Sequence, residues 1–303
     1  MMHNGVLLAI FSAFIFSVMN ALIKAASETI PTAEIVFFRS LIGTVLILML
    51  MRQARVRFST AGIPLLVLRG VFGALYLLAF VYTIANIPIA DAIILAYLSP
   101  FFVILLSHFV LKESLPRGAA LWLAVVLLGA AMIINPLKYE SFNLYAIAGI
   151  ASAAFAACAS ITIKKLSKHH HTYEIVFYFL FIATLISAYL MQDSFVMPQG
   201  IAWLYLFAIG AVSLLGQIFL TKAFTHENAA VVAVTRYIGI VFNILWGVLF
   251  WQEIPEALTL MGGVMIVVAS MALGRKNKSA SRSDSDTQSG QTPEAAQEST
   301  SAR

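Results

Sequence analysis

The run EIVFFRSLIGTVLILMLM (34–51) returns in the second half of the chain as EIVFYFLFIATLISAYLM (174–191). The two runs share Glu-Ile-Val-Phe at their starts, Leu-Met at their ends, and an Ile and a Thr at matching positions between them. The match continues outward in the same register without a gap, from Ser12 and Ser152 to Glu113 and Glu253. A repeat of this length indicates that the chain consists of two related halves.

The composition is that of a membrane protein. Hydrophobic residues make up 61% of the 303 residues and charged residues only 11%, and the mean hydropathy is +0.91. Soluble chains contain about 45–50% apolar and about 25% charged residues, so most of this chain must face lipid. The composition therefore excludes a soluble enzyme, a nucleic-acid-binding protein, a disulfide scaffold and a disordered protein. The net charge of +5 fits basic cytoplasmic loops, and the single Cys158 excludes an intramolecular disulfide.

Ten stretches have the length of about 20 mostly apolar residues that a membrane span requires. Backbone in lipid must satisfy its own hydrogen bonds, and the stretches are too long for barrel strands, so they are predicted to be helices. The predicted class is an all-α membrane protein with ten transmembrane helices, at 5–23, 33–51, 63–86, 90–111, 118–135, 144–163, 173–191, 201–222, 229–250 and 257–273.

The basic residues predict the orientation of these spans. With the N-terminus inside, twelve of them fall on the cytoplasmic side and only Lys24 and Lys138 on the other, so both termini are expected to be cytoplasmic. The N-terminus lacks a basic region and a cleavage site, so the first span is expected to be retained. The twelve are Arg52, Arg55, Arg57, Lys112, Arg117, Lys164, Lys165, Lys168, Lys222, Arg275, Lys276 and Lys278.

Each half contains five predicted spans, an odd number, so the second half is expected to lie upside down relative to the first. Inverted repeats of this kind are typical of transporters, which bind their solute near the middle of the membrane where the halves meet. The predicted organisation is a first repeat at 1–135, a connecting loop at 136–143, a second repeat at 144–273, and a disordered polar tail at 274–303.

Several motifs resemble the EamA-like branch of the drug/metabolite transporter superfamily. They are IPIADAIILAYLSPFFVILLS (87–107), its weaker echo NAAVVAVTRYIGIVFNILWG (228–247), and a glutamate near a helix end followed sixteen residues later by glycine, as in Glu113 and Gly129. Glu253 has Ala269 in place of that glycine. The resemblance covers about residues 5–273 and implies ten helices and the export or uptake of small metabolites such as amino acids.

The fourth and ninth spans are interrupted at corresponding places, which is a pointer to a transporter's binding site. Pro100 falls within the fourth span, where it cannot donate to the carbonyl of Ala96, and Gly239 falls within the ninth. Tyr97 and Tyr237 occupy identical repeat positions just before these interruptions. We expect the freed carbonyls and the phenols to bind a polar solute; the alternative is a packing kink with tyrosines facing neighbouring helices.

Three arginines lie inside predicted spans and have no counterpart in the other half. At 1.5 Å per residue, Arg39 and Arg69 lie roughly 9 Å inside their span ends, and Arg236 about 12 Å. Charge at such depth usually faces a cavity or a partner, although snorkelling to the headgroups is the alternative. Forked guanidinium donors match carboxylates and phosphates, so the three arginines favour an anionic solute.

Other polar residues within or near the spans have two interpretations each. Asn20 and Asn243 either line the cavity or bond between helices, and the amphipathic Trp246 is a further candidate for solute binding. Three residues are candidates for proton coupling: Asp91, Glu34 and His108. The alternative for Asp91 is a helix cap or a charge partner for Arg39. The alternatives for the other two are a charge that compensates a helix terminus at Glu34 and a packing role at His108. The run at 169–171, three histidines beside lysines, is expected to be a solvated basic loop rather than a metal site.

The sequence thus predicts a secondary active transporter in a bacterial-type inner membrane, an exporter or exchanger of small polar metabolites such as amino acids or other carboxylate-bearing solutes. The expected partners are the solute, the bilayer and protons, with a homodimer as a further hypothesis, and no nucleic acid, cofactor or metal. No ATP-binding motif is present. The alternatives are a membrane-embedded enzyme, for which the sequence contains no catalytic motif, and a channel.

Overall fold

The computed structural model describes residues 5–96, 98–111, 121–122, 124–125, 128–129, 132, 144–227, 231–232, 235–269 and 271–272. Between residues 89 and 111, several residues are described by their backbone only, among them Pro100 and His108. Tyr97, Glu113, the predicted connecting loop at 136–143 and the predicted tail at 274–303 lie outside the described residues.

All regular elements in the described ranges are helices, and six of them are long and apolar enough to cross a membrane. Because runs of apolar residues satisfy their backbone internally only as helices in lipid, this is the expected form. The six confirm six of the ten predicted spans, with ends within four residues of the predicted ones. They are α1 (Gly5–Ala26), α2 (Thr32–Gln53), α3 (Ile63–Asn86), α7 (Leu144–Leu166), α8 (Thr172–Leu190) and α9 (Ala202–His226).

The fourth and ninth predicted spans are both broken, at the places expected from the sequence. The fourth consists of α4 (Ile89–Ala96) and α5 (Ser99–Leu111), with Pro100 as the second residue of α5. In the ninth, helical residues at 231–232 and 235 end in a turn at Arg236 and Tyr237, and α11 (Ile238–Trp251) follows. A further apolar helix runs over Ala257–Ala269.

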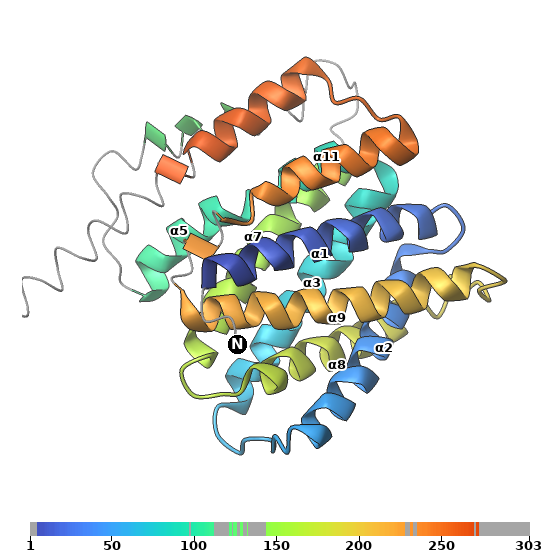
Figure 1. Ribbon diagram of the computed structural model, residues 1–303, viewed down its shortest axis with the longest axis vertical. Helices are drawn as coiled ribbons and strands as arrows, with labels where there is room; N and C mark the ends of the chain where they lie inside the picture. The colour runs from blue at the N-terminus through green and yellow to red at the C-terminus, as the bar shows by residue number, and fades with distance from the viewer. Residues whose placement is uncertain are drawn as a thin grey trace, which may run out of the picture.

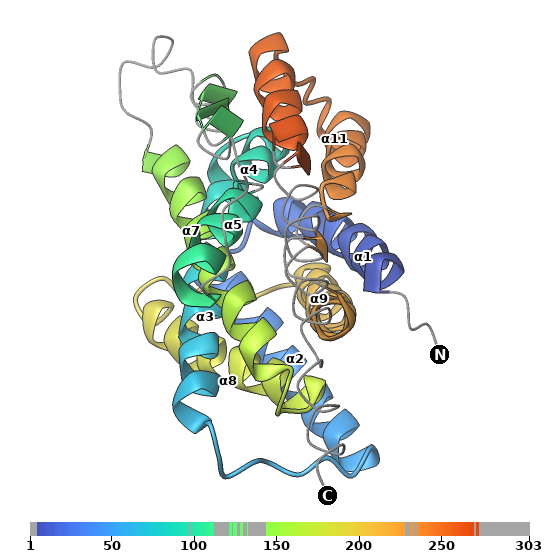
Figure 2. The ribbon, with the colours of Figure 1, turned by 90° about the vertical axis from the view of Figure 1, so that its left-hand side faces the viewer.

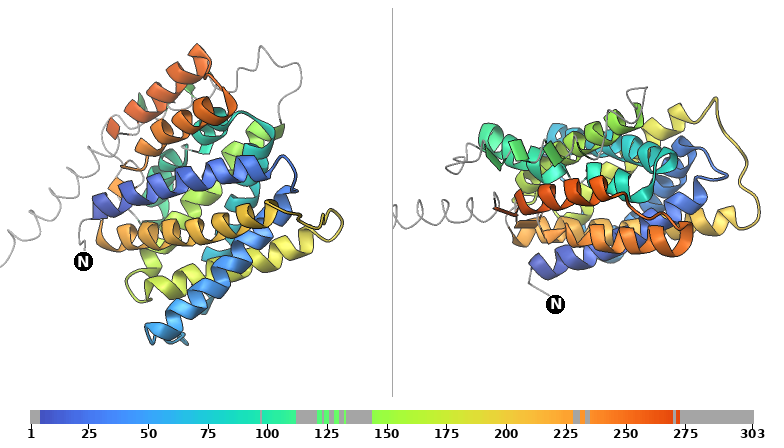
Figure 3. Two further views of the ribbon diagram at one scale, coloured as in Figure 1. Left: turned by 45° about the vertical axis from the view of Figure 1, so that its right-hand side comes forward. Right: turned by 90° about the horizontal axis from the view of Figure 1, so that it is seen from above.

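The helices of the first half pack mainly against those of the second. In Figure 1, α1 and α9 lie side by side and run in opposite directions across the middle of the molecule. Helix α3 packs against α7, and α2 crosses α8. Helix α11 packs on α1 and α4, and the helix Ala257–Ala269 lies beside it (Figures 2 and 3).

The two halves make the same hydrogen bonds at equivalent positions of the repeat. The Nζ of Lys24 donates to the carbonyls of Ile84 (3.3 Å) and Ile87 (3.0 Å), which lie at the end of α3. At the matching positions, the Nζ of Lys164 donates to Phe224 O (3.2 Å) and Glu227 O (2.8 Å), at the end of α9. The last carbonyls of a helix have no partner within it, so these lysines cap the ends of α3 and α9.

We expect Lys24→Met and Lys164→Met to destabilise the purified protein by about 1–3 kcal/mol each, because each leaves helix-terminal carbonyls without a donor. The measurement is thermal unfolding in detergent. Lys165→Met is the matched control, since Lys165 is the exposed neighbour of Lys164 on α7. If all three variants unfold at the same temperature, the capping role assigned to Lys24 and Lys164 is wrong.

A second pair of contacts joins the halves at both ends of α2 and α8. The carboxylate of Glu34, in the first turn of α2, accepts a hydrogen bond from Val196 N (3.0 Å) in the loop after α8. Its counterpart Glu174, in the first turn of α8, accepts one from Ser59 N (2.7 Å) in the loop after α2. Each half therefore binds a loop of the other half through a buried carboxylate. The partial positive charge of a helix N-terminus stabilises a carboxylate in that position.

Two glycines allow α3 and α9 to approach helices of the opposite half. A Cβ at Gly70 would lie 2.8 Å from the backbone oxygen of Tyr178 and would collide with Ile182, both in α8. At the matching position, a Cβ at Gly210 would lie 2.7 Å from Cβ and Cγ2 of Ile42 in α2. The close packing of the two halves thus depends on the absence of a side chain at the same place in each repeat.

Candidate functional site

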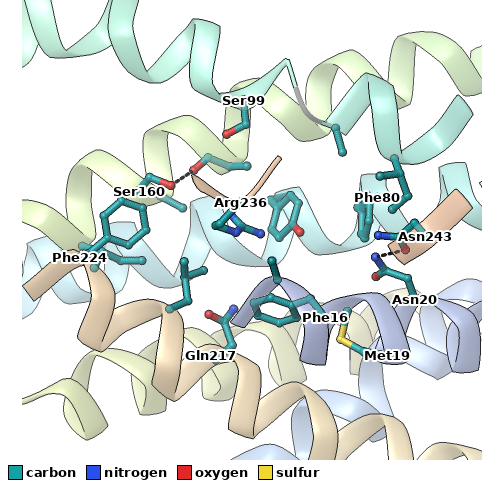
Figure 4. Close-up of a pocket in the computed structure, with 18 of the residues that line it drawn as sticks. Phe16, Met19, Asn20, Phe80, Ser99, Ser160, Gln217, Phe224, Arg236 and Asn243 are labelled. Carbon is teal, nitrogen blue, oxygen red and sulfur yellow. Dashed lines mark hydrogen bonds between the residues drawn. The ribbon is translucent and has the colours of Figure 1, made fainter. Parts of the chain in front are cut away.

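A polar cavity lies between the two halves (Figure 4). Its volume of about 80 Å³ has room for several water molecules but not for a metabolite, so a solute would enter only after the helices move apart. Apolar and aromatic side chains form part of its wall, including Phe16, Phe80 and Phe224. The polar lining residues are Asn20, Arg39, Arg69, Tyr76, Ser99, Ser160, Gln217, Arg236 and Asn243.

The structure brings together all three arginines that the sequence singled out. Arg39 comes from α2, Arg69 from α3, and Arg236 from the turn before α11. Arg39 and Arg69 are only 1% and 3% exposed, so they point into the protein and do not snorkel to the headgroups. Each guanidinium lies over an aromatic ring, an arrangement that holds a cation in place while leaving donors for a ligand.

Two asparagines predicted from the sequence lie together at one end of the cavity. The Nδ2 of Asn20 in α1 donates to Oδ1 of Asn243 in α11 (3.0 Å), and Nδ2 of Asn243 donates to Gly239 O (2.6 Å) (Figure 4). The bond to Gly239 ties the amide of Asn243 back to the first turn of its own helix. The pair therefore both lines the cavity and bonds between helices, so the two interpretations of these residues apply together.

Two helices begin at the cavity because of the two broken spans. Ser99, the first residue of α5, lines the cavity, and Arg236 lines it two residues before α11 begins. The N-terminus of a helix carries partial positive charge. At α11 the N–H groups of Gly239 and Ile240 already donate to the carbonyls of Arg236 and Tyr237. The two helix ends therefore add partial positive charge, rather than free donors, to that of the three guanidiniums.

The other candidates for solute binding lie outside this lining or outside the description. Tyr237, which lies in the turn before α11, is 5% exposed and packs in the hydrophobic core. Trp246 donates from Nε1 to Ser17 Oγ (3.1 Å) and stacks on Phe250, so it joins α11 to α1. Tyr97 and the side chain of Pro100 are not among the described parts of the chain.

Two of the three candidates for proton coupling, Asp91 and Glu34, do not line the cavity with the arginines. Asp91, in the first turn of α4, accepts a hydrogen bond from Thr259 Oγ1 (3.0 Å) and does not form the predicted pair with Arg39. Glu34 is fully buried, and its Oε1 has no hydrogen-bond partner among the described residues. His108 lies in α5, and its side chain is outside the description.

The histidine loop before α8 is not simply solvated, which corrects the prediction. Nδ1 of His170 lies 3.0 Å from Oε2 of Glu174, and its side chain is 6% exposed. Burial and the charge of Lys222 lower the pKa of His171, opposed by Glu174, so its neutral ring can accept from Tyr173 N (3.2 Å) and cap α8. The described residues contain no group of three side chains suited to a metal.

Sequence reasoning missed four polar residues of the cavity. Gln217 in α9 is 4% exposed, and its Oε1 has no hydrogen-bond partner among the described residues. Tyr76, Ser99 and Ser160 line the same space from three other helices. A lone amide in the otherwise apolar eighth span was a usable signal for Gln217. Tyrosines and serines are too common in spans to be chosen without knowing which way each helix faces.

Apolar helices that cross a membrane, packed around a buried cationic cavity at broken spans, define a transporter rather than an enzyme. The chain belongs to the EamA-like transporter family, whose model matches residues 3–135 and again residues 143–275. It is accordingly a multi-pass protein of the bacterial inner membrane, of the drug/metabolite transporter type.

Relatives with assigned roles are transporters. The chain is 60% identical over 279 residues to the pseudopaline exporter CntI of Pseudomonas aeruginosa, covering 92% of this chain and 98% of that one. It is 28% identical over 260 residues to the riboflavin transporter of Brucella anthropi, covering 84% and 91%. A crystal structure with 18% sequence identity and a TM-score of 0.66 covers 88% of this chain and 95% of its own, which shows the shared fold.

Proposed function

We propose that this protein exports a small polar metabolite that carries a carboxylate, and that its cargo is pseudopaline or a close chemical relative of it. The observation that supports an anionic cargo is that three guanidiniums line one internal cavity. They come from α2, α3 and the turn before α11. Guanidiniums gathered at an internal cavity favour a ligand that supplies negative charge. The relative with 60% identity supports the choice of cargo and the direction of transport.

The proposed topology is ten spans in two inverted halves, with both termini in the cytoplasm. Hydrogen bonds that recur at equivalent positions of the two halves, and the opposite directions of α1 and α9, support this arrangement. In that orientation, the cavity lining runs from Phe224, near the cytoplasmic end of α9, to Ile93, near the periplasmic start of α4. A cavity that lies between the two membrane sides is suited to a carrier that opens to each side in turn.

Contacts between the halves close the opposite, periplasmic end in this proposal. Lys24 Nζ lies 3.4 Å from Glu253 Oε1, and the other oxygen of Glu253 accepts from Ile89 N (2.8 Å) at the start of α4. Trp251 Nε1 donates a hydrogen bond to Oε1 of Glu28 (3.3 Å), which lies just after the end of α1. Export by alternating access then requires these contacts to break while those around Ser59 and Glu174 hold the cytoplasmic end shut.

Protons are the proposed coupling ion, and Glu34 is the best placed of the three candidates. Its carboxyl is buried at the periplasmic end of α2 in this topology, and one oxygen lacks a hydrogen-bond partner in the described part of the chain. A carboxyl held by one backbone N–H and otherwise buried can exchange a proton when the helices separate. Asp91 and His108 remain the alternative carriers.

The experiment is complementation of a Pseudomonas aeruginosa strain that lacks its own CntI. We expect expression of this chain to return pseudopaline to the medium at a level close to that of the native exporter, and to lower it inside the cells. An empty vector is the negative control, and amino acids are measured in the same media. Pseudopaline that stays inside cells containing normal amounts of the membrane-inserted protein would contradict the proposed cargo.

A further inference from the structure

Arg39 and Arg69 lie over the same aromatic ring, although they come from different helices. The Cζ atoms of Arg39 and Arg69 are 5.9 Å and 4.6 Å from the centroid of Phe179, which belongs to α8. Arg236 lies over a different ring on a different helix, 5.7 Å from the centroid of Phe16 in α1. The cavity therefore has two cationic regions, a paired one at Phe179 and a single one at Phe16.

The paired region carries charge that the described protein does not neutralise. Neither Arg39 nor Arg69 forms an ion pair or a hydrogen bond with a described residue, and Nε and Nη1 of both are buried. Two like charges buried without a partner are strongly unfavourable. An arrangement of this kind is retained when a ligand supplies the missing negative charge.

Residues of α3 shape the space that these guanidiniums occupy. A Cβ at Gly73 would collide with Nη1 of Arg69 and with the ring of Phe179. Tyr76 follows Arg69 by seven residues and Gly73 by three, which places all three on one face of α3. Tyr76 lines the same cavity, so its hydroxyl is available as a third donor.

The position of the pair in the repeat agrees with a solute site. Phe179 occupies in the second half the position that Arg39 occupies in the first. Equivalent residues of two halves can contact each other only at the axis that relates them. In the inverted arrangement proposed above, that axis lies in the membrane plane, so the pair lies near the midplane, where such transporters bind their solute.

We infer that Arg39, Arg69 and Tyr76 form a carboxylate subsite, separate from Arg236, and that the cargo carries at least two anionic groups. Two guanidiniums facing one carboxylate can each donate to one of its oxygens, and Tyr76 can donate to either. A second carboxylate of the same molecule is then free to bind Arg236. This inference deepens the proposed function, and it rests on that function for the statement that the ligand is cargo.

The test compares two sets of probes on the purified protein in nanodiscs. One set is straight-chain dicarboxylates of four to eight carbons, and the other is their mono-amides, which have the same shape with one charge fewer. We expect calorimetric titration to show at least one dicarboxylate binding about tenfold or more tightly than its mono-amide, because a charge-assisted contact is lost. In Arg39→Gln and in Arg69→Gln this preference should fall to about one, whereas the exposed Arg57→Gln should keep it.

Stability measurements separate a binding role from a structural one. Removing an unpaired buried charge should leave the unfolding temperature of ligand-free Arg69→Met unchanged or raise it, while the stabilisation by the dicarboxylate disappears. A lower unfolding temperature with retained dicarboxylate preference would overturn the subsite, and so would an unchanged preference in both glutamine variants. Failure of complementation with a normal dicarboxylate preference would instead overturn the pseudopaline cargo and leave the subsite standing.

Discussion

Export of pseudopaline by the Arg236→Met variant is expected to fall about 100-fold, to near the level of the empty vector. Arg236 faces the cavity at the start of α11, where the helix N-terminus and the guanidinium both favour an anion. Removing one partner of a buried charge pair costs about 2–5 kcal/mol, and about 1.4 kcal/mol corresponds to a tenfold change. The measurement is the initial rate of pseudopaline uptake into inside-out membrane vesicles.

Two variants accompany this measurement. Arg236→Lys keeps the charge but loses the forked donors, so we expect an intermediate rate. Arg57→Met removes an arginine from the exposed loop between α2 and α3, and its rate should equal that of the unmodified protein. An Arg236→Met protein that transports at the normal rate would show that this guanidinium does not contact the cargo.

Gly70→Val is expected to lower the free energy of unfolding by about 3 kcal/mol or more, with little folded protein recovered. The valine would meet both the backbone of Tyr178 and the side chain of Ile182, and a helix backbone cannot rotate away as a side chain tip can. Gly210→Val should have a similar effect, because Ile42 fills the equivalent space in the other half. The measurement is thermal unfolding together with the yield of monodisperse protein in detergent.

Gly263→Ala is the matched control for these glycine variants. Its added Cβ would lie 3.3 Å from Cδ1 of Ile94, the end of a flexible side chain that can move by a few tenths of an ångström. We expect its unfolding temperature to stay close to that of the unmodified protein. Equal stability of Gly70→Val and Gly263→Ala would mean that α3 and α8 do not pack as closely as the structure has them.

The sequence predicted the helices well because lipid leaves the backbone few choices. Runs of about 20 apolar residues define the long spans, and the six long helices end within a turn or so of the predictions. Pro100 and Gly239 also marked the two broken spans, since neither residue supports a continuous helix. What the sequence could not supply is which helices touch, because packing between halves depends on side chains far apart along the chain.

The candidate site was predictable in part, through the cost of charge at depth. Arg39, Arg69 and Arg236 stood out because few charges occur inside apolar spans, and all three line one cavity. Depth along a helix does not give the direction in which a side chain points, so snorkelling could be dismissed for Arg39 and Arg69 only from their burial. For the same reason Trp246, which bonds to Ser17, could not be told from a cavity residue.

The most direct test of an alternating-access exporter is solute counterflow in proteoliposomes. Vesicles containing the purified protein are loaded with unlabelled pseudopaline and placed in a trace of labelled pseudopaline. Our account predicts a transient accumulation of label above its equilibrium level, saturable by unlabelled solute and absent with Arg236→Met. Label that only equilibrates, at a rate proportional to its concentration, would indicate a channel, and the absence of any protein-dependent entry would contradict pseudopaline as the cargo.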